Sequence, residues 1–278
     1  MSHRFPAPAK LNLFLHVVGR RADGYHLLQS IFRLIDRADV VHLTLRDDGV
    51  IAREGEVPGV PEAQDLSVRA ARLLQAHAPP GAGVSIRLDK NLPMGGGLGG
   101  GSSDAATVLL ALNRLWQVNL SRAELQTLAL QLGADVPVFI FGQTAFAEGV
   151  GEILWPVEAA PAWYVVLTPP VQVPTASIFA APELTRDTPP LKIAPFSAGM
   201  GRNDLQPVVM GRHPEVARHI EWLGQFGEAR MTGSGACVFA AFESGSAAQA
   251  VLQRMPGSMQ GFVAQGLDRH PLYDFCAG

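Results

Sequence analysis

Cysteine is nearly absent from this chain, which has only Cys237 and Cys276 in 278 residues. Two cysteines cannot build a disulfide framework, and neither stands in a spacing such as C-x-x-C that would indicate a metal site. The chain also lacks any run of 18 apolar residues, and its first ten residues contain no apolar signal-peptide segment. We therefore expect a mature, soluble protein of the reducing cytoplasm, without a membrane partner.

Charged and aromatic residues are also sparse. Charged residues make up 17% of the chain, aromatic residues 7%, and the net charge is -3. Without a cluster of lysine and arginine, the sequence offers no surface for a nucleic-acid backbone, so we expect no nucleic-acid partner. Apolar residues, by contrast, reach 47%. That fraction argues against long disordered segments and supports a sizeable core.

Strand and helix patterns alternate along the chain and predict an α+β fold. Apolar residues at every second position indicate strands, and apolar residues three and four positions apart indicate helices. Strands are expected over residues 10–19, 40–49, 84–88, 163–167 and 261–267. Helices are expected over residues 66–78, from about 103, over 121–133, and in 214–227 and 246–257.

Local signals predict where two of these helices begin. Ser121 and Glu124 form a capping-box pattern at the start of the helix over 121–133. Ser102 or Ser103 is expected to cap the preceding helix, with Asp104 in its first turn.

The pattern of residue types changes after residue 160. A strongly apolar strand is followed by a loose stretch that contains Pro182, Pro189, Pro190 and Pro195. Beyond this stretch, short helix and strand patterns alternate, as expected for a separate domain. We place a domain boundary near Pro161, which divides the chain into residues 1–160 and 161–278.

The stretch "LPMGGGLGGGSSDAA" has six glycines between Gly95 and Gly101. Glycine loses more conformational freedom on folding than any other residue, so such a run indicates a backbone path that a side chain would block. An expected strand precedes the run and an amphipathic helix follows it, unlike in a flexible linker. Something is therefore expected to sit against this backbone.

Two kinds of ligand fit a glycine run before a helix. Gly95, Gly97 and Gly100 satisfy the G-x-G-x-x-G fingerprint of dinucleotide-binding proteins. However, Asn91, Leu92 and Pro93 lie between the strand and the glycines, and no acidic residue ends a second strand about twenty residues on. The favoured interpretation is a phosphate cradle that lacks the lysine of a Walker A loop. Backbone N–H groups and the helix dipole would hold the anion.

Such a cradle needs a cation from elsewhere, and a kinase needs a group for the proton of the acceptor hydroxyl. Lys10 stands at the start of an apolar strand, where a buried ammonium requires a partner. Asp135 stands just beyond a helix end, before an apolar run. Each has a plainer interpretation, Lys10 as a strand-edge gatekeeper and Asp135 as a cap. Together with the glycine run they suggest a catalytic pair.

Four segments of the chain resemble the successive motifs of the GHMP kinases. They are "PAPAKLNLFLHVVGRRADGYHLLQSIF", "LPMGGGLGGGSSDAATVLLALN", "LGADVPVF" and "MTGSGACVFAAF". The resemblance extends from Pro6 to about Leu267, and "RADGYH" and "GADVPVF" narrow it to the branch that phosphorylates a cytidylated methylerythritol.

The resemblance implies a fold and a reaction. The fold is an N-terminal ribosomal-protein-S5-like domain and a C-terminal ferredoxin-like domain, with the active site in the cleft between them. The reaction is ATP-dependent phosphorylation of the 2-hydroxyl of 4-diphosphocytidyl-2-C-methyl-D-erythritol, in the non-mevalonate route to isoprenoid precursors. The implied small molecules are this substrate, ATP and Mg²⁺.

The resemblance also implies site residues, which we carry over one by one. Lys10 and Asp135 match the family's two catalytic positions, Asp135 as acceptor of the hydroxyl proton. Asn12, one strand period after Lys10, matches a position near the reacting hydroxyl. Residues matched to the rest of the substrate, around the cytosine or nearby, are Tyr25, His26, Phe179 and Thr175.

On the nucleotide side, the resemblance implies that residues 93–103 surround the ATP phosphates. These residues are Pro93, Met94, Gly95, Gly96, Gly97, Leu98, Gly99, Gly100, Gly101, Ser102 and Ser103. The hydroxyl of Ser103 is expected to reach Mg²⁺ or to cap the helix, and no side chain is assigned as a metal ligand. Asp65 departs from the family, which often has asparagine there, so an adenine contact by this side chain is in doubt.

Other functions stay open on the sequence. Another GHMP kinase, of the homoserine or mevalonate type, would have no role for "RADGYH" or Phe179. A non-catalytic nucleotide-binding module would be expected to lack the lysine or the aspartate, and both are present.

Overall fold

The computed structural model describes residues 2–192 and 201–276. Pro195, one of the prolines of the loose stretch, lies outside the described residues. Strands and α-helices are interspersed along the described part of the chain, which confirms the α+β class. In the same part, no helix has both the length and the apolar character needed to cross a bilayer.

The elements follow one another in this order: β1 (Ser2–Arg20), β2 (His26–Arg46), β3 (Ile51–Glu54), a 3₁₀ turn (Glu62–Gln64), α1 (Leu66–Gln75), β4 (Gly83–Asp89), α2 (Gly100–Leu115), α3 (Arg122–Leu130), α4 (Val136–Phe141), β5 (Ala145–Glu148), β6 (Ile153–Pro156), β7 (Trp163–Leu167), α5 (Thr175–Phe179), α6 (Gln206–Arg212), α7 (Pro214–Leu223), β8 (Arg230–Met231), β9 (Val238–Phe242), α8 (Gly245–Leu252), β10 (Gly261–Leu267) and a second 3₁₀ turn (Asp274–Cys276).

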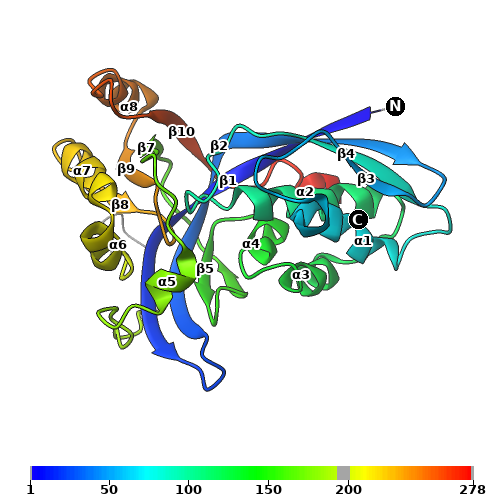
Figure 1. Cartoon of the computed structure of the whole chain (residues 1–278), viewed down its shortest axis with the longest axis horizontal. Coiled ribbons are helices and arrows are strands. Elements are labelled where there is room, and N and C mark those ends of the chain that lie inside the picture. Colours follow the sequence, from blue (N-terminus) through cyan, green and yellow to red (C-terminus); the bar gives the residue numbers. More distant parts are fainter. Residues whose placement is uncertain (1, 193–200, 277–278) are drawn as a thin grey trace.

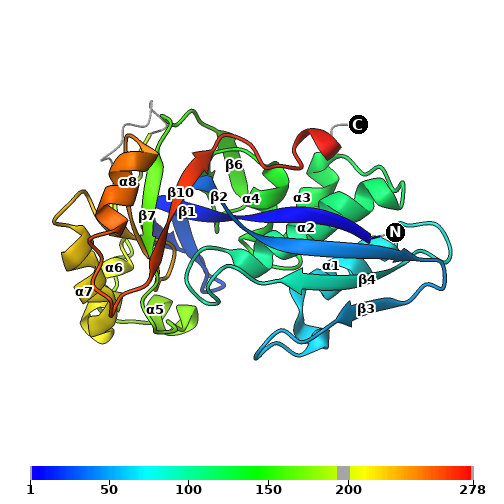
Figure 2. The ribbon, with the colours of Figure 1, turned by 90° about the horizontal axis from the view of Figure 1, so that it is seen from above.

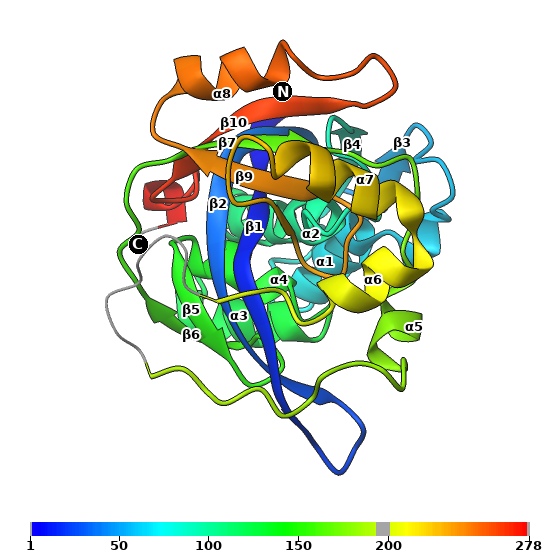
Figure 3. The same cartoon turned by 90° about the vertical axis from the view of Figure 1, so that its left-hand side faces the viewer.

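A long antiparallel hairpin of β1 and β2 is the spine of the molecule (Figure 1). The main sheet has the strand order β3-β4-β2-β10-β7-β9-β8, with β1 and β5 also paired to β2 and β6 paired to β5. Helices α1 to α4 lie on one side of the β2–β4 region, as the view from above shows (Figure 2). Helices α6, α7 and α8 surround β7 to β10 at the other end (Figure 3).

One strand contributes to all three hydrophobic clusters of the core. From β1, Phe5 and Ala7 pack in the cluster with α1 to α4. Further along the same strand, Leu11 packs in a middle cluster with side chains of β7 and β9, while Leu15 and Val17 pack in the cluster with α6 to α8. The continuous apolar run of β1 therefore fixes the two ends of the molecule relative to each other.

Of the two predicted helix N-termini, one is confirmed by the structure. Ser121 and Glu124 form the capping box that their spacing predicts, at the start of α3. The expected start of α2 is wrong, because the N-cap is Gly99 in the left-handed conformation and the helix begins at Gly100. Asp104 consequently lies beyond the first turn of α2.

Candidate functional site

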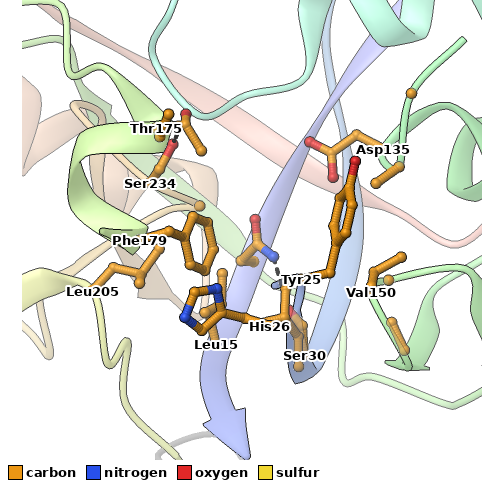
Figure 4. A pocket seen from close by; sticks show the side chains of 18 of the residues that line it. Leu15, Tyr25, His26, Ser30, Asp135, Val150, Thr175, Phe179, Leu205 and Ser234 are labelled. Atoms are coloured by element: carbon orange, nitrogen blue, oxygen red, sulfur yellow. Dashed lines mark hydrogen bonds between the residues drawn. The ribbon is translucent and has the colours of Figure 1, made fainter. Parts of the chain in front are cut away.

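Two cavities meet beside the middle of β1. The first, of about 710 Å³, is bounded by the β1–β2 hairpin, α5 and the loops before α4 and after β8 (Figure 4). The second, of about 540 Å³, is bounded by the glycine-rich segment, residues 57–67 and Lys90. Four residues line both cavities, namely Ser102, Asp135, Thr175 and Ser234. A group bound in one cavity therefore meets a group bound in the other at this shared wall.

Lys10 and Asp135 lie together, as the sequence analysis expects. The Lys10 side chain is 3% exposed, and its Nζ lies 3.5 Å from Oδ2 of Asp135. The Asp135 side chain is 45% exposed at the shared wall. Although Asp135 occupies the N-cap position of α4, its side chain makes no capping hydrogen bond. The interpretation of Asp135 as an ordinary cap is therefore wrong, and its carboxylate is available to the cavities.

Asn12 holds the lysine in place from the same face of β1. Lys10 Nζ donates to Oδ1 of Asn12 at 2.6 Å, and Nδ2 of Asn12 donates to Oγ of Ser30 at 2.8 Å. The Ser30 hydroxyl donates in turn to the carbonyl of Phe14. This chain of hydrogen bonds fixes the amide so that its oxygen faces the ammonium. Asn12 thus orients Lys10 toward the shared wall.

The glycine-rich segment passes very close to its neighbours. A Cβ on Gly97, whose φ is +77°, would lie 2.3 Å from the carbonyl oxygen of Thr232. A Cβ on Gly99, whose φ is +73°, would lie 2.9 Å from the Phe139 ring and 3.2 Å from Cε of Lys10. Both the conformation and the space require glycine at these two positions. The run of glycines is therefore a packed wall rather than a flexible linker.

The N-terminus of α2 opens onto the second cavity. Gly100, Gly101 and Ser102 form the first turn of α2 and line this cavity. The N–H groups in the first turn of a helix have no partner within the helix, and the helix dipole adds partial positive charge there. This turn and the adjacent glycines suit a polyphosphate, as the cradle interpretation expects.

The two serines after the glycines differ in position. Ser102 lines both cavities. Ser103 is fully buried, its hydroxyl donates to the carbonyl of Pro8 at 2.7 Å, and it lines neither cavity. The expectation that the Ser103 hydroxyl reaches Mg²⁺ or caps α2 does not fit this position. Ser102 is the serine that faces the two cavities.

A buried cluster of Lys90, Asp39 and Asp104 supports the second cavity. Lys90 Nζ donates to carboxylate oxygens of both aspartates. Asp39 also accepts from the backbone N–H of Asn91 and Leu92, which lead into the glycine-rich segment. Burial raises the pKa of Asp104 to about 7 against the pull of the Lys90 ammonium, and the nearby Asp39 carboxylate adds to the rise. The cluster fixes the start of the segment.

Asp65, which stands where the family often has asparagine, uses both carboxylate oxygens in contacts within the protein. Its Oδ1 accepts from the backbone N–H of Ser67 as the N-cap of α1, and its Oδ2 pairs with Arg53 at 2.9 Å. Both side chains of this ion pair are nearly buried. The structure explains why an acid is accommodated here, since the capping bond and the arginine satisfy its charge.

The residues expected around the cytosine line the end of the first cavity. Tyr25, His26 and Phe179 surround open space in Figure 4, with Thr175 nearer the second cavity. The His26 and Phe179 rings are 5.0 Å apart at 32°. Tyr25 is 64% exposed at the tip of the hairpin, unlike a core aromatic residue. These rings offer flat apolar faces on both sides of a gap that suits a flat heteroaromatic group.

Three residues of the site were given no individual role from the sequence. Ser30 positions Asn12, and the Ser234 hydroxyl lies 2.6 Å from that of Thr175 at the shared wall. Arg186 donates to His26 from a loop rich in prolines. Ser234 stood within a recognised glycine motif without a role of its own. Nothing in the local pattern around Ser30 or Arg186 indicates these contacts, because their partners are distant in sequence.

The described residues contain no group of three or more His, Cys, Asp or Glu side chains arranged to hold a metal ion. The half-exposed carboxylate of Asp135 and the hydroxyl of Ser102, in the first turn of α2, both line the two cavities and offer oxygen ligands there. Mg²⁺ usually binds through one or two protein oxygens together with substrate phosphates and water. The donor set therefore fits a magnesium ion that arrives with a nucleotide.

Two family models match this chain. The model for the GHMP kinases N terminal domain matches residues 65–143, and that for GHMP kinases C terminal matches residues 190–260. The first match contains the glycine-rich segment and Asp135, and the second contains residues 233–235.

Curated proteins with high identity carry one name. The 4-diphosphocytidyl-2-C-methyl-D-erythritol kinase of Thiobacillus denitrificans is 80% identical over 275 residues, which cover 99% of this chain and 99% of that protein. The protein of the same name from Nitrosospira multiformis is 63% identical over 273 residues, covering 97% and 93%.

Solved structures agree on the fold. A crystal structure of 4-(cytidine 5'-diphospho)-2C-methyl-D-erythritol kinase has a TM-score of 0.81 at 33% identity and covers 96% of this chain and 99% of its own. A mevalonate kinase has a TM-score of 0.67 at 14% identity, covering 96% and 100%. At that identity the second likeness shows a shared fold and no more.

Proposed function

The chain belongs to the GHMP kinases, and within them to the 4-diphosphocytidyl-2-C-methyl-D-erythritol kinases, and on that premise we propose how its two cavities divide the reaction. The chain is a kinase of this substrate. The proposed phosphoryl donor is ATP, and the proposed acceptor atom is the 2-hydroxyl, which yields the 2-phosphate and ADP. The reaction is a step of the non-mevalonate isoprenoid pathway.

ATP is assigned to the second cavity and the cytidylated substrate to the first. The α2 N-terminus and the glycine-rich segment supply N–H donors for phosphates, while the apolar side chains of Val57, Val60, Leu66 and Leu88 also line this cavity and offer a surface for adenine. The aromatic end of the first cavity suits cytosine. With this assignment, the γ-phosphate and the acceptor hydroxyl meet at the shared wall.

The observation that carries the proposal is the position of Lys10 and Asp135 at this wall, 3.5 Å apart. Asp135 is proposed to accept the proton of the hydroxyl as it attacks phosphorus. Lys10, held by Asn12, orients the carboxylate and stabilises negative charge that develops on the transferred group. Magnesium bound with the nucleotide would neutralise phosphate charge, with Ser102 and Asp135 within the wall that it would face.

The acceptor hydroxyl is tertiary and crowded, so its placement matters more than the strength of the base. The fixed elements of the site support this view. Lys10 is buried and hydrogen-bonded, and Asp135 begins a helix whose residues Val136 to Ile140 are all buried. Neither group needs a large rearrangement to reach the wall.

Consumption of ATP with different acceptors tests the proposal. We expect turnover with the cytidylated methylerythritol and none with homoserine or mevalonate. Asp135→Asn and Lys10→Met are each expected to lower kcat by about 10²- to 10⁴-fold, the usual size of general acid–base and charge-stabilising contributions. ATP affinity, measured by calorimetry, is expected to stay within a few-fold of the wild type in Asp135→Asn.

Asp47→Asn is the matched control, because Asp47 is an exposed aspartate in the turn after β2 and lines neither cavity. It is expected to behave as the wild type. Turnover with homoserine or mevalonate in place of the cytidylated substrate would overturn the substrate assignment. Full activity of Asp135→Asn would overturn its role as the base.

We further propose that residues 1–160 and 161–278 are the two domains and that the protein acts in the cytoplasm. The family models fall on either side of residue 160, which supports the boundary. In support of a reducing compartment, Cys237 is a buried free thiol whose pKa is raised by burial to about 12.

A further inference from the structure

Arg186 joins the two pieces of chain that form the aromatic end of the first cavity. It lies in the loop after α5, and its Nε donates to Nε2 of His26 on the hairpin at 3.1 Å. Its terminal nitrogens donate to the carbonyls of Phe179 (2.9 Å), Ala181 (2.6 Å) and Leu184 (3.0 Å). Arg186 does not itself line the cavity, whereas His26 and Phe179 do. Arg186 therefore affects this end of the cavity only through the two residues that it holds.

The hydrogen bond to His26 determines where the imidazole carries its proton. An arginine side chain has only donors and stays protonated, so Nε2 of His26 must be the acceptor. A ring that accepts at Nε2 is neutral and carries its proton on Nδ1. The charged groups that act on this ring are Arg186 and Arg20, and both add to burial in lowering the pKa of His26. Protonation of Nε2 would leave two donors facing each other.

We infer that Arg186 is a positioning residue for the nucleobase, which fixes His26 as a neutral ring whose Nδ1–H donates to an acceptor atom of the cytosine. This inference rests on the proposed function. Cytosine presents two acceptors on its edge, O2 and N3, and Nδ1–H is the hydrogen-bonding group that the ring still has for a ligand. By binding the carbonyl of Phe179 as well, Arg186 sets the spacing of the two rings.

The tautomer is tested directly by long-range ¹H–¹⁵N correlation spectra of the histidine rings in the wild-type protein at pH 7. We expect His26, assigned by comparison with His26→Asn, to show the pattern of a ring protonated on Nδ1 alone. In Arg186→Met we expect a mixture of the two neutral tautomers. A wild-type ring protonated on Nε2, or on both nitrogens, would overturn the inference.

Steady-state kinetics test the consequence for the substrate. Without Arg186 the Nδ1–H form is only a fraction of the neutral ring, and the substrate must select it, so Arg186→Met is expected to raise KM for the cytidylated substrate by up to about tenfold. The values of kcat and of KM for ATP are expected to stay within about twofold, because Arg186 lines neither cavity and its hydrogen bonds go to none of the four residues of the shared wall. Unchanged KM for the substrate in Arg186→Met would overturn the inference.

A double-mutant cycle separates the tautomer from a plain structural role. The amide nitrogen of asparagine is close to the position of Nδ1 and donates without control of a tautomer, so His26→Asn retains the donor. In this background we expect Arg186→Met to raise KM by much less than tenfold. An equal tenfold rise would show that Arg186 acts only by clamping Phe179, which contradicts the inference.

Arg212→Met is the matched control, because Arg212 also binds a carbonyl of α5, that of Ser177, and pairs with Glu183 without contacting His26. It is expected to change neither KM nor the tautomer. Should Arg186→Met fold poorly, Arg186→Lys keeps a cation with a single donor nitrogen and is expected to raise KM less. Absence of wild-type turnover would instead count against the proposed function.

Discussion

The two proposed catalytic residues differ in how deeply they are buried. Lys10 is enclosed and hydrogen-bonded to Asn12, whereas nearly half of the Asp135 side chain is exposed. An exposed carboxylate is hydrated and is a weak base until a bound substrate displaces water from it. The enclosed ammonium, by contrast, is held by Asn12 before any substrate binds. Lys10 is therefore already in place in the free protein, whereas Asp135 is shielded from water only when the substrate binds.

A mutation of Asp104 is expected to show a stability change that depends on pH. Burial raises the pKa of Asp104 from 3.8 to about 7, so between these values the unfolded chain loses a proton that the folded chain keeps. Wild-type stability therefore falls as pH rises through this window. Asp104→Asn cannot ionise, so its melting temperature relative to the wild type is expected to rise from pH 5 to pH 8, as measured by scanning calorimetry.

Asp47→Asn serves as the control here too, since this exposed aspartate should give no difference at either pH. An equal drop in the melting temperature of Asp104→Asn at both pH values would mean that Asp104 is a stably ionised partner of Lys90. That result would contradict the direction of the shift.

Ser103→Ala tests the position of the buried serine. Removing its hydroxyl takes a donor from the carbonyl of Pro8 and is expected to lower the free energy of unfolding by about 1 to 3 kcal/mol. The dependence of turnover on Mg²⁺ concentration is expected to stay that of the wild type, because Ser103 lines neither cavity. A clear rise in the Mg²⁺ concentration for half-maximal turnover would contradict this. Denaturant unfolding measures the first effect.

At the scale of elements, the glycine-rich segment was predicted in part from the sequence. Its density of glycine predicts a constrained backbone before a helix, and the structure agrees. The first residue of α2 is not predicted, because serine is the commoner N-cap while close packing against Phe139 and Lys10 places a left-handed glycine there. Tertiary contacts thus overrode a local preference.

Substitution within this segment is expected to be costly at Gly97. A Cβ in Gly97→Ala would lie 2.3 Å from the carbonyl oxygen of Thr232, in a conformation that alanine disfavours. The segment must then move away from the turn at 232–235, so we expect a lower melting temperature and at least tenfold weaker ATP binding by calorimetry.

The control for this change is Gly211→Ala, near the end of α6. A Cβ at Gly211 would meet nothing within 4 Å, and alanine favours a helix by up to about 1 kcal/mol over glycine. We expect an unchanged or higher melting temperature and wild-type ATP binding. If Gly97→Ala matched this control, the close approach to Thr232 would not matter for the site.

Strands and helices were easier to predict from the sequence than the contacts between them. β10 covers residues 261–267 as its alternation predicts, and α3 begins with its capping box. Lys10 and Asp135, the proposed catalytic pair, were singled out because both stand in recognised motifs, and the structure places them 3.5 Å apart. Arg186 was not found, because its effect depends on a partner 160 positions earlier in the chain. Local patterns report local structure, and such long-range pairs carry no periodic signal.

At the scale of the whole molecule, the strand β1 is expected to make unfolding cooperative. Its side chains belong to all three core clusters, and β10 pairs with β2. Neither proposed domain can lose its core without exposing apolar side chains of the other. We expect urea to unfold the chain in one transition, with coincident curves from Trp116 in one cluster and Trp222 in another, each as the single remaining tryptophan.

Two separated transitions would contradict this prediction and show that residues 1–160 and 161–278 unfold independently. The control is the same pair of single-tryptophan variants followed by circular dichroism, which reports the whole chain. Coincidence of all the curves is the expected result.

The wall shared by the two cavities also bears on inhibitor design. Because Ser102, Asp135, Thr175 and Ser234 face both spaces, one compound with a nucleoside at each end and a short anionic bridge would span the two cavities along these four side chains. Tethering raises the local concentration of the second end once the first has bound. The adenosine end would suit any kinase of this fold, and the cytidine end would confine the compound to chains that have the aromatic gap.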